Sequence, residues 1–481
     1  MSSLESFRQT FKGDIVTPSD ADYNKAIARW AINAERKAKI VAFVKDAADV
    51  SSALKYAKAN ELPVAVRGGG HSASGASSSE GGLVIDLSRH LGGVRVDAEK
   101  KLGYIGGGAI WETVDKAAIA HGLATVGGTV NHTGVGGLIL GGGIGWLCGS
   151  HGLAIDNLVQ ATIVTADGSI VTASETSNPD LFWGIRGGGG NFGVCTEFVQ
   201  KLHPQRASVF AGPMIFSLPR PNAQDTPEKQ VATLKKSTEL LKNIITATQK
   251  WWADGPSEKE GMIQVSRCGN DGSPCIIAFV FYNGSVEEGQ AAFKFMFDLK
   301  PLVARVGEMP YEKLNGVQNA QLQHGDAHYM KGVTQTKLPV KAFQSILDLV
   351  VPVSRKEDEP ELAVIAEYHG LKKMLSVPAE ATAFRRVPGN NVLLLATWKK
   401  QNEENTKLAY DGIRSLVDLI ASSDTGGSTG YGNYNDEEVP EGVAKDRSVA
   451  LFGESYPKLQ ALKKKYDPEN VFSRWFKITP A

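Results

Sequence analysis

The stretch Arg67-Gly68-Gly69-Gly70-His71-Ser72 directly follows the β-type run Pro63-Val64-Ala65-Val66. Glycines in such a loop can adopt positive φ angles and bring backbone N–H groups close together. N–H groups arranged in this way form an anion-binding site that suits a pyrophosphate. The loop lacks the Gly-Lys-Ser/Thr end of a Walker motif. It also lacks the Gly-x-Gly-x-x-Gly that opens a helix in a βαβ unit, so it is not a Rossmann fingerprint.

Three further glycine clusters follow in order along the chain. They are GVGGLILGGGIG at 134–145, GLAIDN at 152–157 and WGIRGGGGNFG at 183–193. A backbone with so few side chains can closely approach something large and flat. The alternative is a glycine-rich structural domain with a surface histidine, and the ordered occurrence of all four clusters disfavours it.

This ordered set of motifs resembles the covalent flavoproteins related to vanillyl-alcohol oxidase, and within them the berberine-bridge-enzyme-like branch. The C-terminal runs YGNYND at 431–436 and YDPENVF at 466–472 match that family too. The resemblance therefore extends from about residue 30 to the end of the chain. It implies a two-domain α+β fold of the vanillyl-alcohol-oxidase type, in which an FAD-binding domain of the PCMH type joins a substrate domain. The substrate domain would be an antiparallel sheet covered by helices.

The composition changes after His203-Pro204, where glycine becomes rarer and longer helical patterns appear, such as 229–250. Strand-like runs beyond this point predict a mostly antiparallel sheet. These runs are 261–265, 276–281, 362–366 and 392–398. The expected parts are an FAD-binding domain at 1–205, a substrate-binding domain at 206–425 and a C-terminal return to the FAD-binding domain at 426–481.

The resemblance implies FAD as the cofactor and His71 as the residue bonded to the 8α-methyl carbon of the flavin. A neutral imidazole is a competent nucleophile for such a bond. Many relatives form a second bond from a cysteine just before the Gly-Val-Gly-Gly motif, and Val130 occupies that position. Valine cannot form the bond. We therefore expect attachment through His71 only, as in members resembling 6-hydroxy-D-nicotine oxidase.

Further FAD contacts follow from the family's motifs by position. The first loop should approach the pyrophosphate, and the second should line the isoalloxazine ring and the ribityl-phosphate chain. The expected contact residues are Arg67, Gly68, Gly69, Gly70, Ser72, Gly134, Gly137, Gly141, Gly142, Gly145, Asp156, Asn157, Val194 and Asn433.

Tyr431 and Glu367 are candidates for the catalytic base that removes a proton as the hydride passes to the flavin, and His369 is a further candidate catalytic residue. Tyr431 is the first tyrosine of a Tyr-x-Asn-Tyr motif that supplies the base in several family members; the alternative is a tyrosine packed at the domain interface. Glu367 and His369 end a strand-like run, where alternate residues share one face, so both would project together. The resemblance implies that this sheet covers the flavin face and that such strand residues line the pocket. The alternative for Glu367 is a solvent-exposed charge on an edge strand.

The resemblance implies an oxidase that transfers a hydride from a CH–OH group of a sugar, or of a secondary or benzylic alcohol, to FAD. Oxygen would reoxidise the flavin and give hydrogen peroxide. The alternatives are oxidation of a CH–NH group or an oxidative ring closure, a dehydrogenase that avoids oxygen, and a flavin-binding protein with little turnover. The expected partners are therefore a small-molecule substrate and oxygen, and the sequence does not name the substrate.

The composition argues against several other classes of function. Lys+Arg and Asp+Glu both total 52, so no nucleic-acid partner is expected. No stretch of about 20 apolar residues and no secretory signal occur, which predicts a cytoplasmic protein without a membrane span. The four cysteines are too few and scattered for a disulfide framework or a metal site. Cys268 and Cys275 flank a turn and could pair, although free thiols are favoured in the cytosol.

Overall fold

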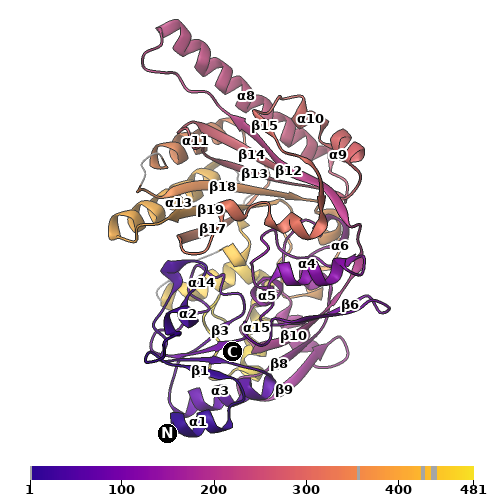
Figure 1. Cartoon of the computed structure of the whole chain (residues 1–481), viewed down its shortest axis with the longest axis vertical. Coiled ribbons are helices and arrows are strands. Elements are labelled where there is room, and N and C mark those ends of the chain that lie inside the picture. The colour runs from indigo at the N-terminus through magenta and orange to yellow at the C-terminus, as the bar shows by residue number, and fades with distance from the viewer. Residues whose placement is uncertain (1–2, 355–357, 424–427, 435–440) are drawn as a thin grey trace.

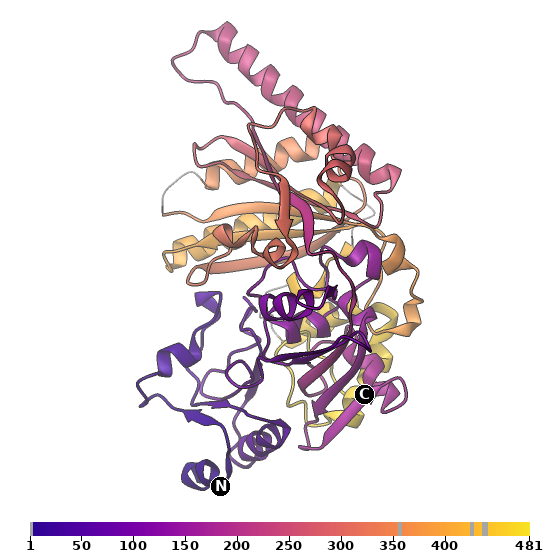
Figure 2. The same cartoon turned by 45° about the vertical axis from the view of Figure 1, so that its right-hand side comes forward.

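The computed structural model describes residues 3–354, 358–423, 428–434 and 441–481. Two parts stack along its long axis (Figure 1). The lower part holds the glycine-rich sequence and both ends of the chain, and the upper part holds one large sheet with helices on its outer face. Figure 2 shows the same two layers from a second direction, with the C-terminal segment lying in the lower part.

The glycine-rich part contains two main sheets. The first has the spatial order β1 (Asp14–Val16), β2 (Ile40–Phe43), β4 (Leu83–Asp86) and β3 (Val64–Arg67). Strands β2 and β3 both run parallel to β4 and are rich in aliphatic residues, as expected for strands that are covered on both faces. Helix α3 (Ala47–Ala59) connects β2 to β3, and the Asp46 side chain caps it by accepting a hydrogen bond from the Asp49 amide.

The second sheet of this part is antiparallel. Its order is β5 (Val94–Asp97), β6 (Leu102–Gly106), β10 (Val194–Lys201), β8 (Leu158–Val164) and β9 (Ile170–Ser174). A short pair, β7 (Leu123–Ala124) and β11 (His203–Pro204), lies at the exit to the upper part. The other helices are α1 (Leu4–Thr10), α2 (Tyr23–Ile27), α4 (Trp111–Ile119), α5 (Val135–Leu140), α6 (Cys148–His151) and α7 (Pro179–Ile185).

The upper part is built on one nine-stranded antiparallel sheet. Its order is β15 (Val303–Ala304), β12 (Ser208–Ser217), β14 (Pro274–Tyr282), β13 (Glu260–Cys268), β18 (Glu361–His369), β19 (Asn390–Trp398), β17 (Ala327–Gln335) and β20 (Ser428–Thr429), with β16 (Gly307–Pro310) also paired to β12. The helices are α8 (Pro227–Asp254), α9 (Val286–Ala292), α10 (Lys294–Phe297), α11 (Val340–Val353), α12 (Lys372–Leu375) and α13 (Glu403–Ser423).

The central strand β18 shows how this sheet separates two environments. Its side chains alternate, as the period of two in a strand requires. Leu362 and Val364 pack into the apolar cluster formed with α11 and α13, whereas Ile365 packs into the cluster shared with the glycine-rich part. Each buried aliphatic side chain of this size contributes about 1.5–3 kcal/mol. The inner face of the sheet is therefore fixed against the glycine loops.

The C-terminal segment returns to the glycine-rich part through α14 (Glu441–Phe452) and α15 (Tyr456–Tyr466). A fully buried cation fastens it there. The Lys463 ammonium donates to the carbonyls of Asn191 (2.7 Å) and Phe472 (2.6 Å) and pairs with the Asp467 carboxylate (2.6 Å). All three ammonium donors are satisfied, which a buried charge requires. The fourth glycine cluster is thus held to the end of the chain.

The predicted α+β class, the helix 229–250 and the four strand-like runs are confirmed by α8, β13, β14, β18 and β19. The domain limits expected at 205 and 425 stay predictions, and the second of them falls in residues 424–427, outside the described part. The Cys275 side chain is a free thiol, so no disulfide closes the β13–β14 turn. Within the described residues, no helix is both long enough and apolar enough to cross a bilayer.

Candidate active site

A long cavity lies between the glycine loops and the inner face of the large sheet. One wall is backbone of the first, second and fourth glycine clusters. The opposite wall is formed by side chains of three adjacent strands, namely Met330 on β17, Ile365 and Glu367 on β18, and Leu393 and Leu395 on β19. The cavity is therefore floored by backbone and roofed by mostly apolar side chains with one carboxyl group.

The floor depends on two loops that touch backbone to backbone. A Cβ atom on Gly69 would lie 2.5 Å from Gly134 Cα and 2.6 Å from its nitrogen, and a Cβ on Gly68 would lie 2.9 Å from the Gly107 carbonyl oxygen. Neither position has room for a side chain. Gly137 differs, because a Cβ there would meet no atom within 4 Å. It borders the open cavity, so its lack of a side chain leaves space for a ligand.

His71 lines the cavity just beyond this contact. Its ring stacks on Trp30, with centroids 4.2 Å apart and planes 10° from parallel. Its Nε2 lies 2.9 Å from Nδ1 of His132. Burial lowers the pKa of His71 well below its usual value, and His132, His324 and His328 lower it further. The imidazole is therefore neutral and keeps a lone pair at neutral pH.

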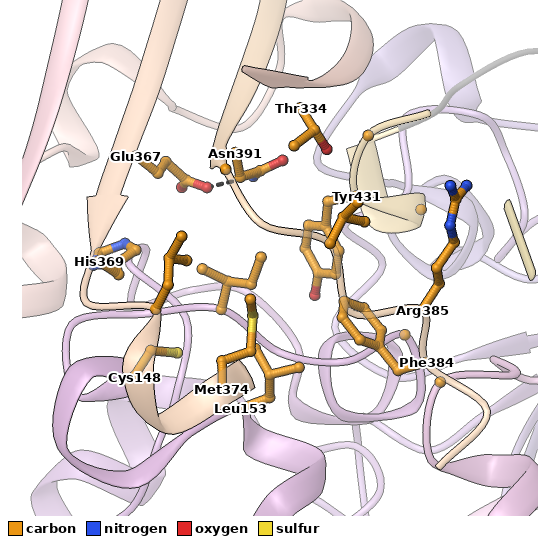
Figure 3. A pocket seen from close by; sticks show the side chains of 18 of the residues that line it. Cys148, Leu153, Thr334, Glu367, His369, Met374, Phe384, Arg385, Asn391 and Tyr431 are labelled. Atoms are coloured by element: carbon orange, nitrogen blue, oxygen red, sulfur yellow. Dashed lines mark hydrogen bonds between the residues drawn. The ribbon is translucent and has the colours of Figure 1, made fainter. Parts of the chain in front are cut away.

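Glu367 is a buried acid on the roof, with 4% of its surface exposed. Figure 3 shows its hydrogen bond from Asn391, whose Nδ2 donates at 2.5 Å. The Tyr434 hydroxyl donates to the other carboxyl oxygen at 3.0 Å. Burial raises the pKa of Glu367 to about 7, although these two donors act in the opposite direction. A carboxyl group with this pKa can exchange a proton near neutral pH.

Tyr431 stands beside Glu367 but is held differently. Its hydroxyl oxygen accepts hydrogen bonds from the Gly143 amide (2.9 Å) and from Asn433 Nδ2 (2.7 Å). Burial raises the pKa of Tyr431 above its ordinary value despite these donors. The phenol is therefore neutral at physiological pH. It joins the second glycine loop to the C-terminal return.

A small side cavity of about 80 Å³ opens from the main one. Ile144, Glu367 and Tyr431 border both spaces. Figure 3 shows its walls, with His369 and Cys148 at one end and Phe384 and Arg385 at the other. Burial lowers the pKa of His369 to about 4, so this histidine is neutral. Glu367 and His369 project from the same face of β18, as their alternation predicts.

Several residues expected at the cofactor serve the layer behind the cavity wall. Asp156 pairs with the buried Arg386 guanidinium at 2.5 Å and also accepts from the Leu153 amide. Asn157 donates to the His151 and Leu153 carbonyls. These contacts orient the third glycine cluster.

Other residues expected at the cofactor also make contacts within the protein. Arg67 pairs with the fully buried Asp86 at 2.9 Å. Val194 packs in an apolar cluster between the sheets, and the Gly142 position packs against the ring of Phe384. The Gly145 position lies against the Gly127 and Gly128 carbonyls. The expected residues that do line one of the two cavities are Gly68, Gly69, Gly70, His71, Ser72, Gly134, Gly137, Gly141, Asn433, Tyr431, Glu367 and His369.

Four residues at the site were not predicted as part of it. Tyr434 is the second tyrosine of the Tyr-x-Asn-Tyr motif, so a sequence signal for it existed. Asn391 is the second residue of β19 and shares its face with Leu393, but nothing local marks it as a partner of Glu367. Trp30 lies in no motif, and His132 precedes the second glycine cluster by two residues. Within the described residues, no group of three or more His, Cys, Asp or Glu could hold a metal ion.

Comparisons with known proteins agree with this architecture. Residues 38–174 match the family described as an FAD binding domain, and residues 430–474 match the family described as berberine and berberine like. An FAD-linked oxidoreductase from Aspergillus terreus is 31% identical over 99% of this chain and 96% of its own length.

Two solved structures are similar over nearly the whole chain. 6-Hydroxy-D-nicotine oxidase from Arthrobacter nicotinovorans has a TM-score of 0.85 and 25% identity, covering 98% of this chain and 99% of that one. Glucooligosaccharide oxidase from Acremonium strictum, which carries a 6-S-cysteinyl, 8α-N1-histidyl FAD, has a TM-score of 0.82 and 21% identity, covering 98% and 97%. The second likeness supports the fold alone.

The residues of the cavity fit FAD. Gly69 and Gly134 form a backbone cradle that a Cβ would fill, and Gly137 leaves open space above it. His71 presents a neutral imidazole to the same space. Val130 also lines the cavity, and its side chain carries no nucleophilic atom.

The cradle yields a testable expectation for Gly69→Ala. The new methyl group must push the two loops apart, which costs about 1–3 kcal/mol. The ratio of flavin to protein absorbance after purification should therefore fall well below that of the unchanged protein. Gly93→Ala is the matched control, because a Cβ at Gly93 meets no atom within 4 Å. Full flavin content in Gly69→Ala would contradict the cradle.

Proposed function

Because the chain belongs to the berberine-bridge-enzyme-like FAD-linked oxidoreductases, we propose that it is an oxidase of a small apolar alcohol. It is an FAD-dependent enzyme. The proposed reaction converts a CH–OH group into a carbonyl group, with oxygen as the final acceptor and hydrogen peroxide as the second product. The observation that carries the proposal is Glu367, a buried acid with a pKa of about 7 on the cavity roof.

FAD, when bound, supplies the hydride acceptor and passes the electrons to oxygen. Glu367 removes the hydroxyl proton of the substrate in this proposal. Asn391 and Tyr434 orient its two carboxyl oxygens and stabilise the ionised form. Tyr431 keeps its own proton and positions the second glycine loop, so it acts as a positioning residue. His369 offers a neutral imidazole for a polar group of the substrate in the side cavity.

The roof favours an apolar alcohol over a sugar. Met330, Ile365, Leu393 and Leu395 present hydrocarbon to the cavity. A sugar ring would leave its other hydroxyl groups without partners against this surface, and each unpaired buried group costs about 1–3 kcal/mol. An aromatic or aliphatic ring with one oxidisable carbon would instead gain from the contact.

Oxidation of a CH–NH group, or an oxidative ring closure, is the second candidate. Glu367 places one carboxyl group among the hydrocarbon side chains of the roof. A protonated amine would pair with the ionised form of this carboxyl group. The similarity to 6-hydroxy-D-nicotine oxidase is consistent with such a substrate. The same residues would act, with the proton leaving nitrogen instead of oxygen.

We further propose that FAD is attached through His71 only. The neutral imidazole is suited to nucleophilic attack, and Val130 stands where relatives carry the second, cysteinyl attachment. The first glycine loop would lie along the pyrophosphate, with Gly134, Gly137, Gly141 and Asn433 near the flavin ring. The contacts expected from Arg67, Gly142, Gly145, Asp156, Asn157 and Val194 stay predictions.

The attachment is tested by denaturing the purified protein in acid. The yellow colour should remain with the precipitated polypeptide, because a carbon–nitrogen bond survives unfolding. His71→Ala should release its flavin to the supernatant or lose it during purification. Release of free FAD from the unchanged protein would contradict the proposal.

The substrate class is tested with a panel monitored by hydrogen peroxide release. Benzyl alcohol, 1-phenylethanol and cyclohexanol represent apolar alcohols, cellobiose and xylobiose represent sugars, and N-methylbenzylamine represents amines. Turnover should be fastest among the apolar alcohols. Turnover of the amine alone would favour the second candidate, and turnover of the sugars alone would contradict the role assigned to the roof.

The pH profile of kcat/KM for the best substrate tests Glu367 as the base. Glu367 must be ionised to accept the proton, so kcat/KM should rise with pH and level off above about 7. Glu367→Gln should lower kcat by about 10²–10⁴-fold and abolish this rise. Asn391→Leu removes a donor that favours the ionised form, so its midpoint should move to higher pH. An unchanged midpoint in Asn391→Leu, or near-normal kcat in Glu367→Gln, would exclude Glu367.

A further inference from the structure

The rings of Trp30, His328 and His132 hold His71 in one orientation. His71 stacks on one face of Trp30, and His328 stacks on Trp30 with centroids 3.9 Å apart and planes 6° from parallel. The stack is anchored at its far end, where His328 Nδ1 lies 3.0 Å from Thr397 Oγ1 on β19. It is also anchored at its centre, where Trp30 Nε1 donates to the Leu322 carbonyl at 3.0 Å. The plane of the His71 ring is therefore fixed by the sheet.

The edge of the ring is fixed by a second histidine. His71 Nε2 and His132 Nδ1 lie 2.9 Å apart, a hydrogen bond in which one nitrogen must donate and the other accept. Both imidazoles are neutral, because burial lowers the pKa of His71 well below its usual value and that of His132 to about 4. Each ring therefore carries one proton, and the tautomer of one determines the tautomer of the other.

Only one of the two arrangements leaves His71 Nδ1 free to form a bond. The Nε2 of His132 is buried and has no hydrogen-bond partner among the described residues. Burial and His324 lower the pKa of His132, and the Leu322 backbone acts in the opposite direction. With its proton on Nε2, His132 accepts at Nδ1. His71 then donates from Nε2 and keeps an unprotonated Nδ1.

We propose that His132 is a positioning residue for flavin attachment, which holds His71 in the tautomer whose Nδ1 lone pair bonds to the 8α carbon of FAD. The proposal rests on the attachment at His71 proposed above. It gives the contact between the two histidines a chemical role, whereas packing alone would not require a particular tautomer.

The attachment step would involve only His71, His132, FAD and oxygen. A bond forms between His71 Nδ1 and the 8α carbon as that carbon loses a proton. His71 would become a cation, so it gives its Nε2 proton to His132 Nδ1, from where the proton reaches solvent. The lone pair of Nδ1 would form the new carbon–nitrogen bond, and the two electrons of the broken C–H bond would stay on the flavin and reduce it. Oxygen, the oxidant of the proposed reaction, removes them as hydrogen peroxide.

The experiment starts from full-length apoprotein made in riboflavin-depleted cells and then supplied with FAD. Two quantities are followed, namely the flavin that stays with acid-precipitated protein over time and the non-covalent affinity for FAD measured by flavin fluorescence quenching. His132→Leu removes the acceptor, and His132→Asn keeps an oxygen near the position of Nδ1. His324→Asn is the matched control, because His324 is an exposed histidine whose ring lies 4.9 Å from that of His132.

His132→Leu should bind FAD with near-normal affinity but attach it about tenfold or more slowly. His132→Asn should recover much of the rate, and His324→Asn should match the unchanged protein. Attachment at the normal rate in His132→Leu would overturn the proposal. Equal loss of affinity and rate in both His132 variants would also overturn it, because that pattern indicates a packing role. Release of flavin by the unchanged protein would instead contradict the attachment at His71.

Discussion

The backbone of Gly69 lies against the backbone of Gly134, and the geometry of the site depends on this contact. No side chain fits between the two loops, so their approach is set by main-chain atoms alone. His71 follows Gly69 by two residues and His132 precedes Gly134 by two, so the crossing of the loops brings the two imidazoles within hydrogen-bonding distance. The same contact forms the floor on which a flat cofactor can lie.

The chemistry comes from the opposite wall. Burial and alternation along β18 place one acid above the floor, and burial raises the pKa of that acid to about 7. Donors from β19 and from the C-terminal return hold that acid, and the return is itself fastened by the buried Lys463. Binding and proton transfer thus depend on segments from both ends and the middle of the chain.

The sequence predicted the floor better than the roof, for a physical reason. A cradle made of backbone requires runs of glycine, and such runs are visible locally, as is His71 within them. Glu367 and His369 could be placed on one face because strand alternation is also local. Asn391 and Trp30 reach the site only through long-range packing. The contact between Asp156 and the cofactor stays a prediction, but the motif of Asp156 could not reveal Arg386, a partner 230 residues away.

Peptide mapping by mass spectrometry tests the central claim, a flavin bound through one histidine, most directly. Trypsin releases the segment between Arg67 and Arg89, which contains His71. This peptide should carry the mass of the flavin, with fragmentation locating it on the histidine, and the peptide containing Val130 should be unmodified. An unmodified His71 peptide from flavin-replete protein, or flavin on another residue, would contradict the account.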